Sequence, residues 1–362
     1  MRIKLSTLQV CAIAYFIILS NNLGITVYNM FHYTRQDSLI TIFIGTVLGF
    51  IPLLVYLKIM NYKPSLNFFE KVNSCLPSCI SFIVNLVITL VILYTTTLFF
   101  YNMTNFISSQ YLPKTPSMIV YIFFLLPIVY LLNKGLTVIG RTTFVLLLIS
   151  ITLLFLSVIG LIWQINIDNL FPILENGFGG PIKNSLIYIC YNIVPLIMLS
   201  VIPLDNIVDK DKFNKRMIIT YIVSNIVIFI FFFLILTILG SNLANLYQFP
   251  EYDLLKKVSL FGFIERTEST VSLRWIFYIF IMVVMGIYFI CEYLKYTFKI
   301  KNKKINKIIG FLISLVVVVA SNYLFKNNTV ANIFIYNKLS FVIWFVLFGI
   351  PFLISFNIKK KL

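Results

Sequence analysis

Apolar residues fall in about ten long blocks along the chain, separated by short segments that carry charge, glycine or proline. The blocks are apolar on all sides, and about 20 such residues cross a bilayer as a helix at 1.5 Å per residue. The alternation over about 10 residues that marks outer-membrane barrels is not their pattern. The sequence therefore predicts an all-α integral membrane protein with spans at about residues 5–29, 38–59, 79–105, 117–132, 138–163, 184–203, 217–240, 271–294, 305–325 and 333–356.

The first block carries polar residues in its middle, at Asn21, Asn22 and Gly24. Two amides and a glycine at membrane depth are costly unless they line a cavity or contact other protein. Several transporter folds build a ligand site at the membrane midplane from such an interruption. We therefore expect the first spanning helix to be broken there.

A matching interruption follows about half a chain later, at residues 191–195 (YNIVP). Pro195 lacks the helical N–H donor and clashes with the carbonyl of Tyr191, which frees carbonyl groups near Tyr188 and Tyr191. Ten spans divide into five and five, and a repeated unit with an odd number of spans inserts upside down. The sequence predicts one transmembrane domain, 1–362, built as a 5+5 inverted repeat with broken helices 1 and 6. Its parts are a first repeat at about 5–163, a second at about 184–356 and outer-loop helices at about 241–270.

The two breaks predict the kind of ligand. Half-helices offer free N–H groups to a carboxylate and free carbonyls to an ammonium group, so a small zwitterion such as an amino acid fits. Tyr94 and Thr97 place hydroxyls on one face of span 3, and we expect spans 3 and 8 to complete the wall. The alternative for each residue is a helix–helix hydrogen bond worth about 0.6 kcal/mol. The candidate ligand-binding residues are Asn21, Asn22, Gly24, Tyr94, Thr97, Tyr188, Tyr191, Asn192 and Pro195.

Composition and charge fix the setting and the orientation. Hydrophobic residues make up 60% of the chain and charged residues 11%, against about 45–50% and 25% in soluble domains. The net charge of +17 does not indicate nucleic-acid binding, because twenty of the 29 Lys and Arg residues fall in loops on one side. The positive-inside rule then predicts that both termini are cytoplasmic and that residues 241–268 lie outside.

Catalytic, cofactor and metal chemistry are not expected. His32 is the only histidine, and no nucleophile–base pair can be assembled around it. Cys75 and Cys79 lie four apart but have no histidine or acidic neighbours for a metal. Glu292, near the end of span 8, is the main acidic residue within a span, which leaves coupling to an ion open.

Residues 249–268 (FPEYDLLKKVSLFGFIERTE) resemble the long outer loop of the permease-like B subunit of spore-germination nutrient receptors. Gly140-Arg141 at the start of span 5 and residues 170–177 before span 6 support the resemblance, and the ten-span pattern extends it over the whole chain. It implies the amino acid–polyamine–organocation superfamily and a LeuT-like fold. It also implies germinant recognition in the spore inner membrane, in contact with lipid, with a receptor A subunit and a lipoprotein C subunit as partners.

Two functions remain open. A receptor subunit binds a small nutrient, and binding shifts a two-state equilibrium within a complex. An amino-acid permease of the same superfamily carries its solute by alternating access. Residues 21–25 (NNLGI) lack the Gly-x-Gly of amino-acid transporters, so the identity of the ligand stays open.

Overall fold

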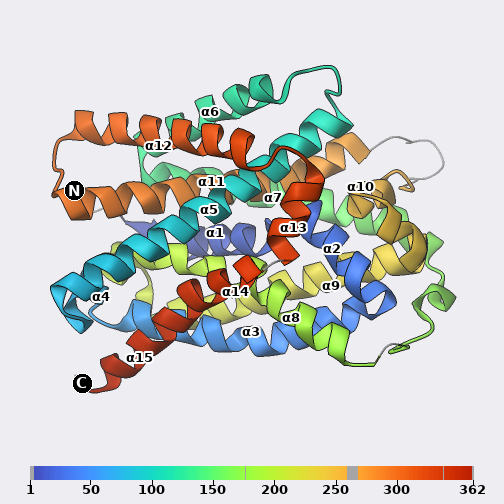
Figure 1. Ribbon diagram of the computed structural model, residues 1–362, viewed down its shortest axis with the longest axis horizontal. Coiled ribbons are helices and arrows are strands. Elements are labelled where there is room, and N and C mark those ends of the chain that lie inside the picture. Colours follow the sequence, from blue (N-terminus) through green and yellow to red (C-terminus); the bar gives the residue numbers. More distant parts are fainter. Residues whose placement is uncertain (1–3, 176, 259–267, 337, 361–362) are drawn as a thin grey trace.

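A computed structural model describes residues 4–175, 177–258, 268–336 and 338–360. Most of its long helices run along the longest axis of the molecule (Figure 1). In the described residues, nine helices are long and apolar enough to cross a membrane, and Thr7–Leu19 is a shorter apolar helix. The predicted all-α membrane fold is confirmed.

The first half of the chain matches the predicted spans closely. Its helices are α1 (Thr7–Leu19), α2 (Ile25–Thr34), α3 (Ser38–Asn61), α4 (Phe68–Cys75), α5 (Ser78–Gln110), α6 (Ser117–Lys134) and α7 (Leu136–Leu161). Short 3-10 turns follow at η1 (Arg35–Asp37), η2 (Ile162–Gln164) and η3 (Ile167–Leu170). Helix α5 extends five residues beyond the predicted end of span 3, to Gln110.

The second half contains more interruptions than we expect from the sequence. Span 10, predicted at about 333–356, falls in α13, α14, η7 and α15; α14, η7 and α15 follow one another without a gap, and η7 is a π-helix. The elements are α8 (Gly179–Asn192), η4 (Val194–Val201), η5 (Leu204–Asn206), η6 (Lys210–Lys212), α9 (Phe213–Leu246), α10 (Pro250–Leu255), α11 (Glu268–Phe298), α12 (Lys303–Leu324), α13 (Asn328–Tyr336), α14 (Lys338–Trp344), η7 (Phe345–Gly349) and α15 (Ile350–Lys360).

Both predicted helix breaks are present. The first separates α1 from α2, and Gly24 within it has φ +68° and ψ −114°, a conformation that residues with a Cβ rarely adopt. The second separates α8 from the 3-10 helix η4, and Pro195 lies in the first turn of η4. Helix α1 packs on η4 and α2 packs on α8. The two broken helices are therefore neighbours in the interior of the bundle.

Small residues on α3 let the second broken helix approach closely. A Cβ added to Gly45 would lie 2.5 Å from Cδ1 of Tyr188, and one added to Gly49 would collide with Ile193. The pair of glycines four apart thus receives two bulky side chains of the α8–η4 region.

The start of α1 is tied to the segment that follows η4. Strand β1 (Leu5–Ser6) pairs in parallel with strand β2 (Ile207–Val208). The hydroxyl of Thr7 donates a hydrogen bond of 2.6 Å to the carbonyl of Val208. This contact fastens the two broken helices to each other at one end of the bundle.

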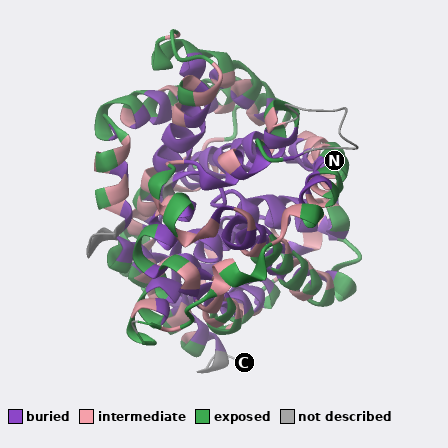
Figure 2. Ribbon diagram, turned by 90° about the vertical axis from the view of Figure 1, so that its right-hand side faces the viewer, coloured by how far each residue is buried: buried purple, intermediate pink, exposed green. Residues whose placement is uncertain are grey.

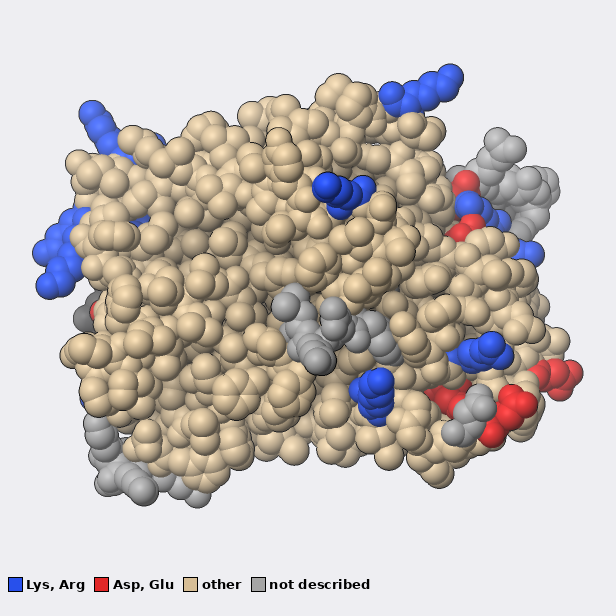
Figure 3. Space-filling view, in the orientation of Figure 1, with Lys and Arg blue, Asp and Glu red and all other residues tan. Residues whose placement is uncertain are grey.

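The distribution of side chains fits a bilayer. Buried residues fill the centre of the bundle and exposed ones lie on its outside (Figure 2). In α11, 83% of the apolar membrane window is buried, and in α8 with η4 89% is buried, whereas only 28% is buried in each of α6, α7 and α12. Charged side chains gather towards the two ends of the molecule in Figure 3, and both termini lie at one end in Figure 1. The chain is an integral membrane protein.

Candidate ligand-binding site

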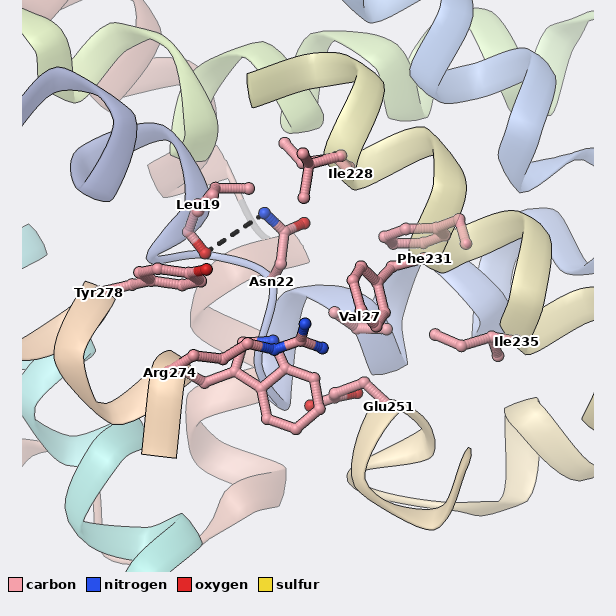
Figure 4. Close-up of a pocket in the computed structure, with 12 residues that line it drawn as sticks. Leu19, Asn22, Val27, Ile228, Phe231, Ile235, Glu251, Arg274 and Tyr278 are labelled. Carbon is pink, nitrogen blue, oxygen red and sulfur yellow. Dashed lines mark hydrogen bonds between the residues drawn. The ribbon is translucent and has the colours of Figure 1, made fainter. Parts of the chain in front are cut away.

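A small cavity of about 20 Å³, room for about one water molecule, lies beside the break between α1 and α2. Aliphatic and aromatic side chains of α1, α2, α9 and α11 form most of its wall, and four polar side chains join them (Figure 4). These four are Asn22, Glu251, Arg274 and Tyr278.

The polar groups of the break are engaged by different neighbours. Asn21 accepts a hydrogen bond from the Thr26 hydroxyl. Asn22 donates one of 3.3 Å to the carbonyl of Leu19 and remains 9% exposed at the cavity. Asn102 of α5 donates one of 2.5 Å to the carbonyl of Leu23. Asn22 is therefore the amide of the break that can meet a ligand in this cavity.

Glu251 reaches the break from α10, the short helix in the connection between α9 and α11. Its side chain is 2% exposed, and its Oε1 accepts a hydrogen bond from the backbone N–H of Gly24. Gly24 precedes the first residue of α2, where the helix dipole favours a negative charge. Oε2 has no hydrogen-bond partner among the described residues.

Burial raises the pKa of Glu251 to about 8, and the hydrogen bond from Gly24 opposes the shift. Burial dominates because it removes water from the charged carboxylate. This loss of hydration destabilises the charged form more than the hydrogen bond from one N–H group stabilises it. Glu251 thus carries a proton in most molecules at neutral pH.

Arg274 of α11 projects into the cavity and is 1% exposed (Figure 4). Its guanidinium carbon lies 3.9 Å from the ring centre of Phe231 and 4.8 Å from that of Trp275. None of its three side-chain nitrogens has a hydrogen-bond partner, and no carboxylate forms an ion pair with it, within the described part of the chain. A guanidinium stays charged in proteins, so the cavity contains a buried cation stabilised only by aromatic rings.

The candidate residues of the second break are buried, and their side-chain hydrogen bonds go to other helices or to the backbone of α8 itself. The hydroxyl of Tyr188 donates to Oδ1 of Asn225 at 2.5 Å, and Tyr191 shares a hydrogen bond of 3.1 Å with Ser340. The amide of Asn192 donates to the carbonyl of Tyr188 at 3.1 Å. Together with Pro195, these residues pack the bundle beside the first break but do not line the cavity described here.

Tyr94 and Thr97 of α5 face a different neighbour as well. Tyr94 packs against the rings of Phe325 and Phe334, with centres 6.0 and 6.3 Å away. The hydroxyl of Thr97 donates to the carbonyl of Tyr94 at 2.7 Å, as threonine in a helix commonly does. The expected wall from span 8 is present as α11, whereas α9 stands where we expect span 3.

Two ionisable side chains that line the cavity, Arg274 and Glu251, are not among the candidate residues predicted from the sequence. Arg274 has a recognisable signal, since a lone ionisable residue within an apolar block is costly and rare. Glu251 has no such signal in the sequence, because it lies in a loop and reaches the break only through the packing of α10. Helix α10 (Pro250–Leu255) lies within the outer-loop helices predicted at about 241–270, and residues 259–267 of that stretch lie outside the described residues.

Broken helices that pack together around a small internal cavity are typical of the LeuT-like fold of membrane proteins. A solved structure of the manganese transporter of Eremococcus coleocola has the same fold. The two align with a TM-score of 0.53 and 14% sequence identity, over 98% of this chain and 85% of that one.

The chain belongs to the spore germination protein family, whose profile matches residues 4–358. It is 28% identical over 256 residues to spore germination protein A2 of Bacillus subtilis strain 168, covering 69% of this chain and 66% of that protein. It is 26% identical over 244 residues to spore germination protein XB of Bacillus anthracis, covering 65% and 63%. The alignments thus span just under two thirds of the length of these relatives. The family predicted from the sequence is confirmed.

Proposed function

We propose that the chain is the membrane subunit of a spore nutrient-germinant receptor and that it binds a small nutrient in the cavity beside Asn22. The observation that carries the proposal is the pair of buried ionisable side chains, Glu251 and Arg274, whose free polar atoms lie at a broken membrane helix. Membrane proteins bury such groups rarely, and mainly at sites of ligand or ion recognition. Membership of the spore germination family supplies the setting.

The proposed signal starts with the docking of α10 on the break. Glu251 holds α10 to Gly24, and a nutrient that enters the small cavity must rearrange this contact. Binding then favours the rearranged state by the difference in affinity between the two states. The proposed partners that read the change are a receptor A subunit and a lipoprotein C subunit.

The proposed location is the spore inner membrane, with both termini cytoplasmic. The excess of Lys and Arg in one set of loops supports this orientation. It places α10 on the outer side, where a nutrient arrives.

The alternative function is an amino-acid permease. The shared fold with a transporter favours it. Transport would require the β1–β2 end and the α10 end to open in turn around the cavity.

Two assays separate these functions. The first replaces Val27, a buried wall residue, by Phe and measures nutrient-triggered germination, with the exposed Val47→Phe on α3 as the matched control. The proposal expects Val27→Phe to abolish the response and Val47→Phe to retain it, both at normal membrane levels. The second measures uptake of labelled amino acids into liposomes that contain the purified protein. Concentrative uptake would favour the permease, and a normal germination response from Val27→Phe would contradict the site.

A further inference from the structure

Resting on the proposed function, we propose that the nutrient carries a carboxylate and that Arg274 is the residue that binds it. The inference names the chemical class of the ligand and the side chain that selects it. It starts from the hydrogen-bonding state of the guanidinium.

The aromatic neighbours of Arg274 leave its hydrogen-bonding edges free. The ring centre of Phe231 lies 3.9 Å from the guanidinium carbon, so the ring covers one face of the guanidinium group. The N–H donors lie in the plane of the guanidinium, and none is used within the described residues. A carboxylate matches this planar fork with two parallel hydrogen bonds.

No described residue of the cavity wall forms an ion pair with Arg274. Glu251 is the only carboxyl group among the described wall residues, and it forms no ion pair with Arg274. Its Oε1 is bound to Gly24 instead. An uncharged ligand would leave the buried cation unpaired, whereas an anion would satisfy its charge and its donors together.

Glu251 also explains why the anion would bind Arg274 rather than the break. In folds with broken helices, the N-terminus of a half-helix is the usual binding site for a carboxylate. Here the Glu251 side chain already occupies the N–H of Gly24. Among the described wall residues, the side-chain donors without a partner therefore belong to α11, on Arg274 and Tyr278.

The size of the cavity restricts the rest of the ligand. At about 20 Å³ it must expand to admit even a small organic acid. Phe231 and Trp275 beside Arg274, and Ile235 elsewhere in the wall, are apolar and suit a short hydrocarbon group. Small amino acids and small hydroxy or dicarboxylic acids share this chemistry, and the experiment distinguishes them.

The binding experiment uses the full-length protein in lipid nanodiscs. The probes are the twenty L-amino acids, L-lactate and succinate, together with glucose and inosine as neutral nutrients. The primary amide of the best acid is the matched ligand control, because it keeps the shape and loses the charge. We expect only carboxylates to bind, and the amide to bind about a hundredfold more weakly, as for loss of one partner of a buried charge pair. L-alanine against L-lactate decides whether the amino group is also recognised.

Variants of Arg274 separate ligand binding from a purely structural role. Arg274→Gln should abolish the preference for the acid over its amide, and Arg274→Lys should keep part of it because the charge remains without the fork. Arg274→Met should raise the melting temperature of the ligand-free protein, since it removes an unpaired buried charge. Arg141→Met, at an exposed position on α7, is the matched control and should leave both readouts unchanged.

Each result bears on a different claim. A lower melting temperature for Arg274→Met, with the acid preference intact in Arg274→Lys and Arg274→Gln, would make Arg274 structural and overturn the inference. Binding of glucose or inosine that Arg274→Gln does not alter, or the absence of binding by every carboxylate, would also overturn it. Those results leave the proposed function standing, because it is tested separately by the germination response of Val27→Phe and by the uptake assay.

Discussion

The backbone N–H of Gly24 donates a hydrogen bond to the side-chain carboxyl of Glu251, 227 positions further along the chain. The bond joins the broken first membrane helix to α10, a six-residue helix in the connection after α9. Because both groups are buried, the bond closes the break on the side of α10. The docking of α10 is therefore coupled to the conformation of the first broken helix.

The stability of this contact should depend on pH through Glu251. Its pKa is about 8 in the folded protein, against an ordinary value of 4.5. Because the folded pKa is raised, the folded state binds the proton more tightly than the unfolded state. The contribution of Glu251 to the free energy of unfolding is full below pH 4.5. It falls by about 1.4 kcal/mol per pH unit up to about pH 8. We expect the contribution of Glu251 to the melting temperature to fall from about pH 4.5 up to about pH 8, the range between its two pKa values.

Replacement of Glu251 by Gln removes the titration and keeps the shape. The melting temperature of Glu251→Gln should therefore depend less on pH than that of the wild type. Asp253→Asn is the control on the same helix, since Asp253 pairs with Lys256 at 2.6 Å and is not at the break. Equal pH slopes for the wild type and Glu251→Gln would show that the carboxyl is not buried as described.

The membrane spans and both helix breaks could be predicted from the sequence, because their signals are local. A block of apolar residues defines a span, and an amide pair or a proline within it defines a break. Asn22 belongs to the amide pair that predicts the first break, and it lines the cavity. Span 10 is predicted as one helix, and Pro351 is the sequence signal of its π-helix at Phe345–Gly349, since a proline opposes the carbonyl four residues back, that of Leu347.

The partners of each polar side chain could not be predicted, since they depend on which helices meet. Tyr188 and Asn192 have the residue types of a ligand site, yet their hydrogen bonds go to Asn225 and to the backbone. Glu251 lies in a loop by sequence and is among the most buried acids in the fold. A polar residue in a membrane helix therefore predicts a polar contact but does not identify the partner.

Gly24 should tolerate no side chain. A Cβ there would lie 2.5 Å from Cε1 of Phe249 and 2.7 Å from Oδ1 of Asn102, and its φ of +68° adds strain. We expect Gly24→Ala to destabilise the protein by about 2–5 kcal/mol, from backbone strain and overpacking together. Gly135→Ala is the matched control, because Gly135 also has positive φ but no atom within 4 Å of the added Cβ. Equal losses of melting temperature in the two variants would mean that Phe249 moves aside freely.

Gly49 should be required for the approach of the second broken helix to α3. An added Cβ would collide with Cδ1 of Ile193 and lie 2.5 Å from the hydroxyl of Tyr221. Gly49→Ala should cost about 1–3 kcal/mol of stability. Ile193→Val deletes the colliding methyl group, so the double variant should be less destabilised than the sum of the single changes.

The control for Gly49→Ala is Gly310→Ala on α12, where the nearest atom to the added Cβ is 3.9 Å away. That change should be neutral or stabilising, because alanine favours a helix by about 1 kcal/mol over glycine. If the losses from Gly49→Ala and Ile193→Val simply add, the two residues do not touch in the way described. Thermal unfolding of the four variants in one detergent supplies the comparison.

Asn22 and Tyr188 should respond differently to substitution, although both were predicted to bind the ligand. Asn22 faces the cavity, so Asn22→Ala should weaken binding of the best acid by about tenfold, or 1.4 kcal/mol, with little change in melting temperature. Tyr188→Phe removes a hydrogen bond to Asn225, which keeps a second donor in Thr46 at 3.1 Å. It should lower stability by about 1 kcal/mol and leave affinity unchanged. If Tyr188→Phe instead weakens binding while Asn22→Ala does not, the nutrient binds at the second break, between α8 and η4, and the cavity beside Arg274 has another role.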